Sequence, residues 1–251
     1  MRIFAFHCGG DRAPRSVYDP LDDDPGSIVY GPYYFFLVDH PSGWVLFDTG
    51  CHPKWAAAAH EEGALSVEVR EEHLVPAQLA ALGLEPSDVE HVVVSHLHFD
   101  HAGGLRYFPH ARVYVNEREL PFAYRPAVYQ RAFYDRDDFD HPLQWIEVGD
   151  SYDLFGDSSI RLIATPGHTP GHQSMLVELT SGLHVLAADV SYWTSKMRER
   201  RLPGILWNPD EMVRSWGAVE ELERTRQARL VFTHDPEDED RKPVAPDEWY
   251  A

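Results

Sequence analysis

Apolar and polar positions follow two regular patterns along the chain, and the first is the alternation typical of β-hairpins. Residues 33–50 (YYFFLVDHPSGWVLFDTG) hold two β-rich runs separated by a Pro-Ser-Gly turn at 41–43. Residues 174–189 (SMLVELTSGLHVLAAD) repeat this arrangement around the Ser-Gly pair at 181–182. Because these residue types favour tight turns, both segments are predicted to be hairpins.

The second pattern is helical spacing of apolar residues, in 75–84 (VPAQLAALGL), which ends near Gly83, and in 210–226 (DEMVRSWGAVEELERTR). Continuous apolar runs predict further strands at 91–95, 111–115, 159–166 and 228–234. Strands that alternate with helices indicate an α/β fold. No internal repeat or low-complexity linker interrupts the sequence, so a single domain is predicted over residues 1–251.

Residues 117–145 (ERELPFAYRPAVYQRAFYDRDDFDHPLQW) are aromatic and irregular. A short helix followed by an excursion over the surface is expected, serving as a lid or a dimer contact. A peripheral loop packed by its own aromatic rings is the alternative. Six rings of this segment could line an apolar groove or an interface between subunits: Phe122, Tyr124, Tyr129, Phe133, Tyr134 and Trp145.

Composition narrows the class of protein. The chain has 251 residues, of which 43% are hydrophobic, and its net charge of −19 repels nucleic acid and acidic membrane surfaces. No apolar run approaches the roughly 18 residues of a membrane span, and the first ten residues (MRIFAFHCGG) are too short a run for a signal-peptide core. A cytoplasmic location is therefore expected. The two cysteines, Cys8 and Cys51, predict neither a disulfide framework nor a thiolate metal site.

One basic cluster stands apart from the acidic background, in residues 194–204 (TSKMRERRLPG). It contains Lys196, Arg198, Arg200 and Arg201. A solvated loop is the favoured interpretation, and a patch for an anionic group of a substrate or partner is the alternative.

Metal-ligating side chains follow four separate apolar strands. His96 comes after the run VVVS, His168 after RLIATPG, Asp189 after LHVLAA and His234 after RLVFT. In α/β folds, the carboxyl ends of the strands form the edge where loops build active sites. These four side chains are therefore expected to meet at one edge of a sheet.

The segment HLHFDHAGG (96–104) adds further ligands. His96 and His98 alternate along an extended segment and share one side, so Asp100 and His101, inside the following turn, can face a neighbouring ion. Gly103 and Gly104 are expected to let the backbone turn sharply as a helix starts.

The complete set exceeds what a single ion needs, because a catalytic zinc takes three protein ligands and keeps one position open. Two ions are expected, particularly if one carboxylate bridges them. Nitrogen and oxygen donors permit zinc, iron, cobalt or manganese, and so many buried imidazoles without a metal would be costly. The predicted ligands are His96, His98, Asp100, His101, His168, Asp189 and His234.

Two nearby polar residues have more than one interpretation. Asp48, in LFDTG, ends a strand and is either a carboxylate that accepts a hydrogen bond from a ligating imidazole or an ordinary turn residue. His172, in TPGHTPGHQS, lies close to the predicted ligands in sequence. Structural packing is the favoured role for His172, and support of a metal ligand is the alternative.

The motifs SHLHFDHAGG, TPGHTPGHQS, AADVSY and THD, in this order, resemble the metallo-β-lactamase superfamily. The resemblance runs from FDTG to THD, over most of the chain. It implies an αβ/βα sandwich of two mixed β-sheets flanked by helices, with the metals at one edge. The spacing from Asp189 to Tyr192 and the motif HTPGHQS are similar to N-acyl homoserine lactone lactonases and their γ-butyrolactone hydrolase relatives.

This resemblance implies roles for the site residues. His96, His98 and His168 would hold one divalent metal, Asp100, His101 and His234 the other, and Asp189 would bridge them. The metals are expected to be zinc, with a bridging hydroxide that attacks the ester carbonyl of a neutral lactone.

Three side chains would then act on the substrate. Tyr192 would contact the lactone carbonyl and stabilise the oxyanion, Phe99 would line the pocket, and Asp100 would pass a proton to the leaving alkoxide. As a packed ring with an exposed hydroxyl, Tyr192 would have only a structural role.

The expected function is hydrolysis of N-acyl homoserine lactones, that is, quorum quenching, with a γ-butyrolactone or broad lactone hydrolase as the alternative. A glyoxalase II-like thioesterase would need a further carboxyl-terminal region, and only 17 residues follow His234. Flavodiiron proteins carry glutamate where His98 stands, so this class of protein is not favoured. Persulfide dioxygenases keep the HxHxDH pattern but use one iron, and a non-catalytic metal-binding module is the remaining option.

Overall fold

The computed structural model describes residues 1–57, 66–237 and 242–251. Within them, strands form a sheet in the order β4-β1-β2-β3-β5-β6-β7 and a second sheet in the order β12-β11-β10-β9-β8. In the first sheet, β1 is Arg2–Pro14, β2 Ile28–His40, β3 Gly43–Phe47, β4 Ser66–Glu68, β5 Val89–Val93, β6 Arg112–Asn116 and β7 Gln144–Val148. In the second, β8 is Ser151–Asp153, β9 Ile160–Ala164, β10 Gln173–Leu179, β11 Gly182–Ala188 and β12 Arg229–Phe232.

Helices connect and cover these strands. The α-helices are α1 Pro53–Ala57, α2 Val75–Ala80, α3 Phe99–Ala102, α4 Glu119–Tyr124, α5 Arg136–Phe139, α6 Thr194–Arg198 and α7 Pro209–Arg226. Short 3-10 turns are η1 Arg15–Val17, η2 Glu71–His73, η3 Pro86–Asp88, η4 Leu105–Tyr107 and η5 Arg131–Phe133. Asn208 caps α7 by accepting hydrogen bonds from the backbone amides of Asp210 and Glu211.

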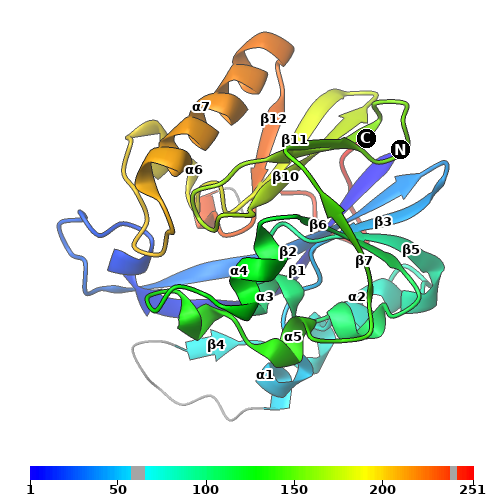
Figure 1. Ribbon diagram of the computed structural model, residues 1–251, viewed down its shortest axis with the longest axis horizontal. Coiled ribbons are helices and arrows are strands. Elements are labelled where there is room, and N and C mark those ends of the chain that lie inside the picture. Colours follow the sequence, from blue (N-terminus) through cyan, green and yellow to red (C-terminus); the bar gives the residue numbers. More distant parts are fainter. Residues whose placement is uncertain (58–65, 238–241) are drawn as a thin grey trace.

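The two sheets pack face to face because side chains alternate between the faces of each strand. On β2, Phe36 belongs to the apolar layer between the sheets, whereas Phe35 faces the layer that contains Leu79 of α2. In the second sheet, Val185 faces outward and packs with Trp216 of α7. Figure 1 shows the result, with α7 outside one sheet and α1, α2 and α5 outside the other. The expected αβ/βα sandwich of two mixed sheets is confirmed.

Strand direction places the candidate ligands. In the first sheet β3, β5, β6 and β7 run parallel. In the second sheet β9 and β11 are both antiparallel to β10, and β12 is parallel to β11. The carboxyl ends of β9, β11 and β12 therefore lie at one edge of that sheet, as the strand-end pattern predicted.

Both predicted hairpins are confirmed, as β2–β3 and β10–β11, and α7 is confirmed at Pro209–Arg226. The helix predicted at 75–84 is shorter, since α2 ends at Ala80 and Gly83 adopts a φ of +73° in the turn after it. The long strand β1 was not predicted. Its apolar pattern is interrupted by glycine, but it pairs with β2 and, through Gly10–Arg12, with β4.

The segment 117–145 is more regular than expected. It contains α4, η5 and α5, and its end enters β7, so that Trp145 pairs with Val113 in the first sheet. The expected surface excursion therefore ends before Gln144. The ring of Trp145 packs against the core beside α2 instead of lining a groove.

The basic cluster is partly solvated, as expected, since Arg198 and Arg200 are exposed, but it begins on helix α6 instead of forming a loop. Its cations are paired with carboxylates and do not form a free anion-binding patch. Arg201 and Lys196 approach the fully buried carboxylate of Asp19 at 2.8 and 3.4 Å. Arg198 and Arg200 contact carboxylates of α7, at distances from 2.5 to 3.0 Å. These ion pairs attach α6 to the β1–β2 loop and to α7. In the described part of the chain, no helix is long and apolar enough to cross a membrane.

Candidate metal centre

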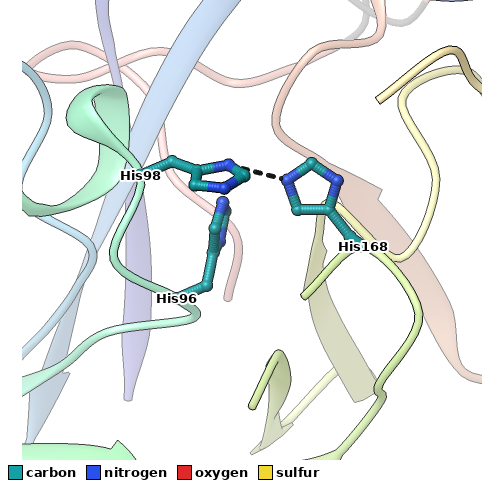
Figure 2. A group of neighbouring side chains, drawn as sticks. All are labelled: His96, His98 and His168. Atoms are coloured by element: carbon teal, nitrogen blue, oxygen red, sulfur yellow. Dashed lines mark hydrogen bonds between the residues drawn. The ribbon is translucent and has the colours of Figure 1, made fainter. Parts of the chain in front are cut away.

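The first group of candidate ligands is His96, His98 and His168, which Figure 2 shows with their rings converging. One ligand atom from each lies within 4.8 Å of the others, and all three residues are buried. His96 and His98 come from the loop after β5 and His168 from the loop after β9. The Nδ1 atom of His98 lies 3.0 Å from Nε2 of His168. At this distance the two nitrogens can share one proton or bind one metal ion.

The second group is Asp100, His101 and His234, whose ligand atoms also lie within 4.8 Å of one another. Asp100 and His101 lie on α3, and His234 follows β12. The Oδ2 atom of Asp100 lies 3.5 Å from Nε2 of His101 and 3.4 Å from Nε2 of His234. Helix α3 therefore aims its carboxylate and imidazole at the ring from the second sheet.

Asp189 lies between the two groups. Its Oδ1 atom is 3.4 Å from Nε2 of His101 and 3.2 Å from Nε2 of His234, while its Oδ2 atom is 3.4 Å from Nε2 of His168. One carboxylate oxygen thus faces each group. The preceding residue, Ala188, has a φ of +47°, a conformation that side-chain-bearing residues rarely adopt.

The chemistry of these donors fits divalent metal ions. Several buried site atoms have no hydrogen-bond partner among the described residues: His96 Nε2, His98 Nε2, His101 Nε2 and Asp189 Oδ1. Burial lowers the pKa of His96 and His98 well below the usual range, so their rings are neutral and carry lone pairs. Although burial acts to raise it, neighbouring His234 and His101 hold the pKa of Asp189 well below its usual range. Against the effect of burial, the neighbouring carboxylates raise the pKa of His101 and His234, so these two rings bind a metal by giving up a proton. Neutral imidazoles and ionised carboxylates are the forms that bind metals.

Hydrogen bonds at the opposite ring nitrogen fix several tautomers. The Nδ1–H of His168 donates to the carbonyl of Ile205 at 3.1 Å, and that of His234 donates to the carbonyl of Pro32 at 2.9 Å. A carbonyl oxygen can only accept, so each Nδ1 carries a proton, and Nε2 is the nitrogen that offers its lone pair when the ring is neutral. Both Nε2 atoms face the site.

Asp48 orients His101 in a similar way. Its Oδ2 atom accepts from Nδ1 of His101 at 2.8 Å, and its carboxylate also accepts from the amide and hydroxyl of Ser95 at 2.7 and 2.8 Å. The Ser95 hydroxyl donates to Asp48 and therefore accepts from Nδ1 of His96, 3.0 Å away. Asp48 has the positive φ of a turn residue, +63°, but its hydrogen bond to His101 gives it the supporting role that was the first of the two interpretations.

His172 is buried and supports the backbone at Asp189. Its Nε2 atom accepts from the amide of Asp189 at 3.1 Å, which requires the proton on Nδ1, 3.0 Å from the carbonyl of Thr165. Burial lowers the pKa of His172 to about 3, in keeping with a neutral ring. Its role is therefore structural, and it acts on a candidate ligand through the main chain.

Glu119, the first residue of α4, was missed in the sequence. Its buried carboxylate accepts from the amide of Leu97 at 3.0 Å and the hydroxyl of Tyr134 at 2.9 Å. It also accepts from the hydroxyl of Thr169 at 2.7 Å and the amide of Gly171 at 3.1 Å. Glu119 thus joins the loop that carries His96 and His98 to the loop that carries His168.

Gly103 and Gly104 serve close approach instead of the sharp turn that was expected. Gly103 has an ordinary φ of −62°. A Cβ atom there would overlap the backbone amide of His52, and one at Gly104 would overlap the carbonyl of Thr49. Both glycines let the segment after α3 pack directly on the loop after β3.

A cavity of about 360 Å³ opens beside the ligands. Tyr192 and Phe99 line it, and the Tyr192 ring centroid lies 5.3 Å from that of His234 and 5.6 Å from that of His168. Of the six aromatic residues expected to form a groove, only Phe133 lines this cavity. The rest of the wall beyond the ligands comes mainly from β1, the loop after it, β2, α1, β4 and the segment between α6 and α7: Asp11, Val17, Tyr18, Tyr33, Lys54, Trp55, Val67 and Ile205.

Comparison with known proteins is consistent with this geometry. The model of the metallo-beta-lactamase superfamily matches residues 29–234. The N-acyl homoserine lactonase AttM of Azorhizobium caulinodans is 39% identical over 217 residues, which cover 82% of each chain. The N-acyl homoserine lactonase AiiA of Bacillus thuringiensis subsp. kurstaki is 30% identical over 231 residues, with 89% of each chain covered.

A solved structure of an N-acyl homoserine lactone hydrolase, with the product N-hexanoyl-L-homoserine bound at its catalytic metal centre, is also similar. It superposes with a TM-score of 0.88 at 25% sequence identity and 98% coverage of each chain. Fold, motif order and relatives agree: the chain belongs to the metallo-beta-lactamase superfamily and, within it, to the family of N-acyl homoserine lactonases.

Proposed function

We propose that this protein is a metal-dependent hydrolase that opens the lactone ring of N-acyl homoserine lactones at a centre holding two divalent ions, with zinc as the expected metal. The observation that carries the proposal is the position of Asp189, which directs one oxygen to each of two ligand groups beside a cavity. The similar proteins named as N-acyl homoserine lactonases support the choice of substrate.

When bound, the metal ions supply a deprotonated water at neutral pH and Lewis acidity. Residues of the chain stabilise the developing negative charge and transfer the proton. Burial raises the pKa of the Tyr192 hydroxyl well above its usual range, so it stays protonated and can donate to the oxygen of the ester carbonyl as negative charge develops. Asp100, which also lines the cavity, is the residue we assign to taking the proton from the hydroxyl group that has added to the ester carbon and passing it to the ring oxygen as the C–O bond breaks.

The wall of the cavity supports a neutral, acylated substrate. Phe99, Phe133, Trp55 and Ile205 offer apolar surface for an acyl chain. A neutral lactone is not repelled by a chain whose net charge is −19. Residues 117–145 contribute Ala132, Phe133 and Asp135 to the wall, which supports a role of this segment as a lid. The single domain, the homodimer and the cytoplasmic location stay predictions from the sequence.

The test is hydrolysis of N-hexanoyl-L-homoserine lactone by zinc-loaded protein, followed by acid release in a pH-stat and by mass spectrometry. We expect one acid equivalent per molecule opened, a product heavier by one water, and loss of activity after chelation. The same protein is assayed on a glutathione thioester and for oxygen uptake with glutathione persulfide. Turnover of either of these without ring opening of the lactone would overturn the proposal.

A second comparison separates signal degradation from general lactone hydrolysis. We expect kcat/KM for a long-chain N-acyl homoserine lactone to exceed that for unsubstituted γ-butyrolactone by a hundredfold or more, about 2.7 kcal/mol of transition-state binding. Comparable values for the two substrates would instead identify a broad or γ-butyrolactone hydrolase.

A further inference from the structure

A buried carboxylate lies in the wall of the cavity, and the proposed chemistry does not use it. Asp11 of β1 is 8% exposed and lines the cavity together with Tyr192 and His234. Burial raises its pKa to about 6, so it is mostly ionised at neutral pH. Burying a carboxylate is costly unless donors satisfy it. Its position in a substrate cavity therefore indicates a role in binding.

The protein fills only part of the hydrogen-bonding capacity of this carboxylate. The Tyr18 hydroxyl donates to its Oδ1 atom, and Tyr18 is the only side chain among the described residues that donates to Asp11. A carboxylate has about four acceptor positions. Lys54 and Asp135, also at the cavity, form an ion pair with each other. Metal ligands and this ion pair aside, Asp11 is the charged group of the described wall, and its carboxylate has acceptor positions left for a substrate.

The pair of Asp11 and Tyr18 is held in place by its surroundings. Tyr18 stacks on Trp193, with ring centroids 5.3 Å apart and an angle of 11° between the planes. Asp11 is paired in the sheet with Gly31, where a Cβ atom would overlap the Tyr18 hydroxyl and approach Asp11 Oδ1 to 2.7 Å. The glycine therefore provides the space in which the hydrogen bond forms.

The position of the pair relates it to the reacting group. The Tyr18 ring contacts the Tyr192 ring edge to face, with centroids 5.5 Å apart and an angle of 71°. An ester carbonyl bound at Tyr192 and the metal ligands would place its neighbouring substituents on this side of the cavity. In an N-acyl homoserine lactone, the carbon atom next to the ester carbonyl carries the amide nitrogen, whose N–H is the only good donor of an unsubstituted acyl substrate.

We propose that Asp11 accepts a hydrogen bond from this amide N–H and thereby selects N-acylated lactones over lactones that lack a donor at that position. Tyr18 is a positioning residue that fixes the carboxylate. The inference rests on the proposed function and adds to it the substrate feature that is recognised. A hydrogen bond to an ionised acceptor discriminates strongly, because an analogue without the donor leaves a buried charge unpaired.

The test compares one lactone that carries the N–H donor with two lactones that lack it. N-Hexanoyl homoserine lactone carries the N–H, the corresponding α-hexanoyloxy lactone replaces it with an ester oxygen, and γ-butyrolactone carries no substituent. For Asp11→Ala we expect kcat/KM for the amide to fall at least tenfold, about 1.4 kcal/mol. The value for the α-hexanoyloxy lactone should hold or rise, because the variant no longer leaves a buried charge unpaired against it, and the value for γ-butyrolactone should change less than about twofold. The two other substrates serve as internal controls for folding and metal content.

Asp11→Asn keeps the size of the side chain and a neutral acceptor, so a smaller selective loss is expected, and it replaces Asp11→Ala should that variant fold poorly. Tyr18→Phe should lower selectivity in the same direction, mainly through KM. An equal loss on all three substrates, or no change in their ratios, would overturn the inference. Wild-type protein that opens none of the lactones would instead refute the proposed function.

Discussion

Each of three histidine rings in the candidate metal centre is oriented by a hydrogen bond from the ring nitrogen that faces away from the site. Asp48 holds His101, whereas the backbone carbonyls of Pro32 and Ile205 hold His234 and His168. Asp48 could be suspected from the sequence because it follows a strand at the same edge as the ligands. The two carbonyls could not, because any residue type supplies one and only the tertiary fold brings their loops to the site.

Asp100→Asn tests the proton transfer at this scale. Asparagine can still bind a metal through oxygen but cannot carry the proton, so kcat is expected to fall by a factor of about 10² to 10⁴ with both metals retained. The loss should be smaller on an N-acyl homocysteine thiolactone, whose leaving thiolate is less basic. Rates are measured on protein of known metal content.

Asp135→Asn is the matched control, since Asp135 lines the same cavity but pairs with Lys54. It should change kcat little. An unchanged kcat for Asp100→Asn with full metal content would remove the proton-transfer role from Asp100.

Helix α4 contributes a connection between the ligand loops that no sequence motif predicts. Glu119 accepts three hydrogen bonds from the two loops that carry His98 and His168, and a fourth from the hydroxyl of Tyr134. In the sequence it is an ordinary acidic residue at a helix start, and its partners become visible only when the two sheets face each other. Elements with a regular pattern, such as α7 and the two hairpins, were predictable because local spacing determines them.

Glu119→Gln should therefore loosen the metal centre without touching a ligand. The amide nitrogen would face donors of Thr169 and Gly171 or of Leu97 and Tyr134, leaving at least one buried donor unsatisfied at about 1–3 kcal/mol. We expect a lower melting temperature and roughly tenfold or greater loss of metal affinity. The readouts are metal retained after dialysis against a graded chelator and the d–d spectrum of cobalt-substituted protein.

Tyr134→Phe removes one of the four donors and leaves the carboxylate intact, so it should retain most of the metal affinity. Should Glu119→Gln bind cobalt with wild-type affinity and spectrum, Glu119 would have no positioning role at the centre.

At the scale of the whole molecule, the sandwich and its family were recognisable because ligands follow strands in a fixed order. The substrate cavity was not. The expected aromatic groove of residues 117–145 contributes only Phe133 of its six rings, whereas β1 and the β1–β2 loop contribute Asp11, Val17 and Tyr18, which were not predicted. That loop reaches the cavity because Asp19 is paired with Arg201 and Lys196 near the other end of the chain. Such long-range ion pairs leave no local pattern in the sequence.

The measurement that tests the two-metal centre most directly is stepwise reconstitution of metal-free protein with Zn²⁺. Bound metal and hydrolysis of N-hexanoyl-L-homoserine lactone are followed together. Two ligand groups bridged by Asp189 predict that activity reaches its maximum at two equivalents of zinc per chain. Full activity at one equivalent, with no gain from the second, would contradict a dinuclear catalytic centre.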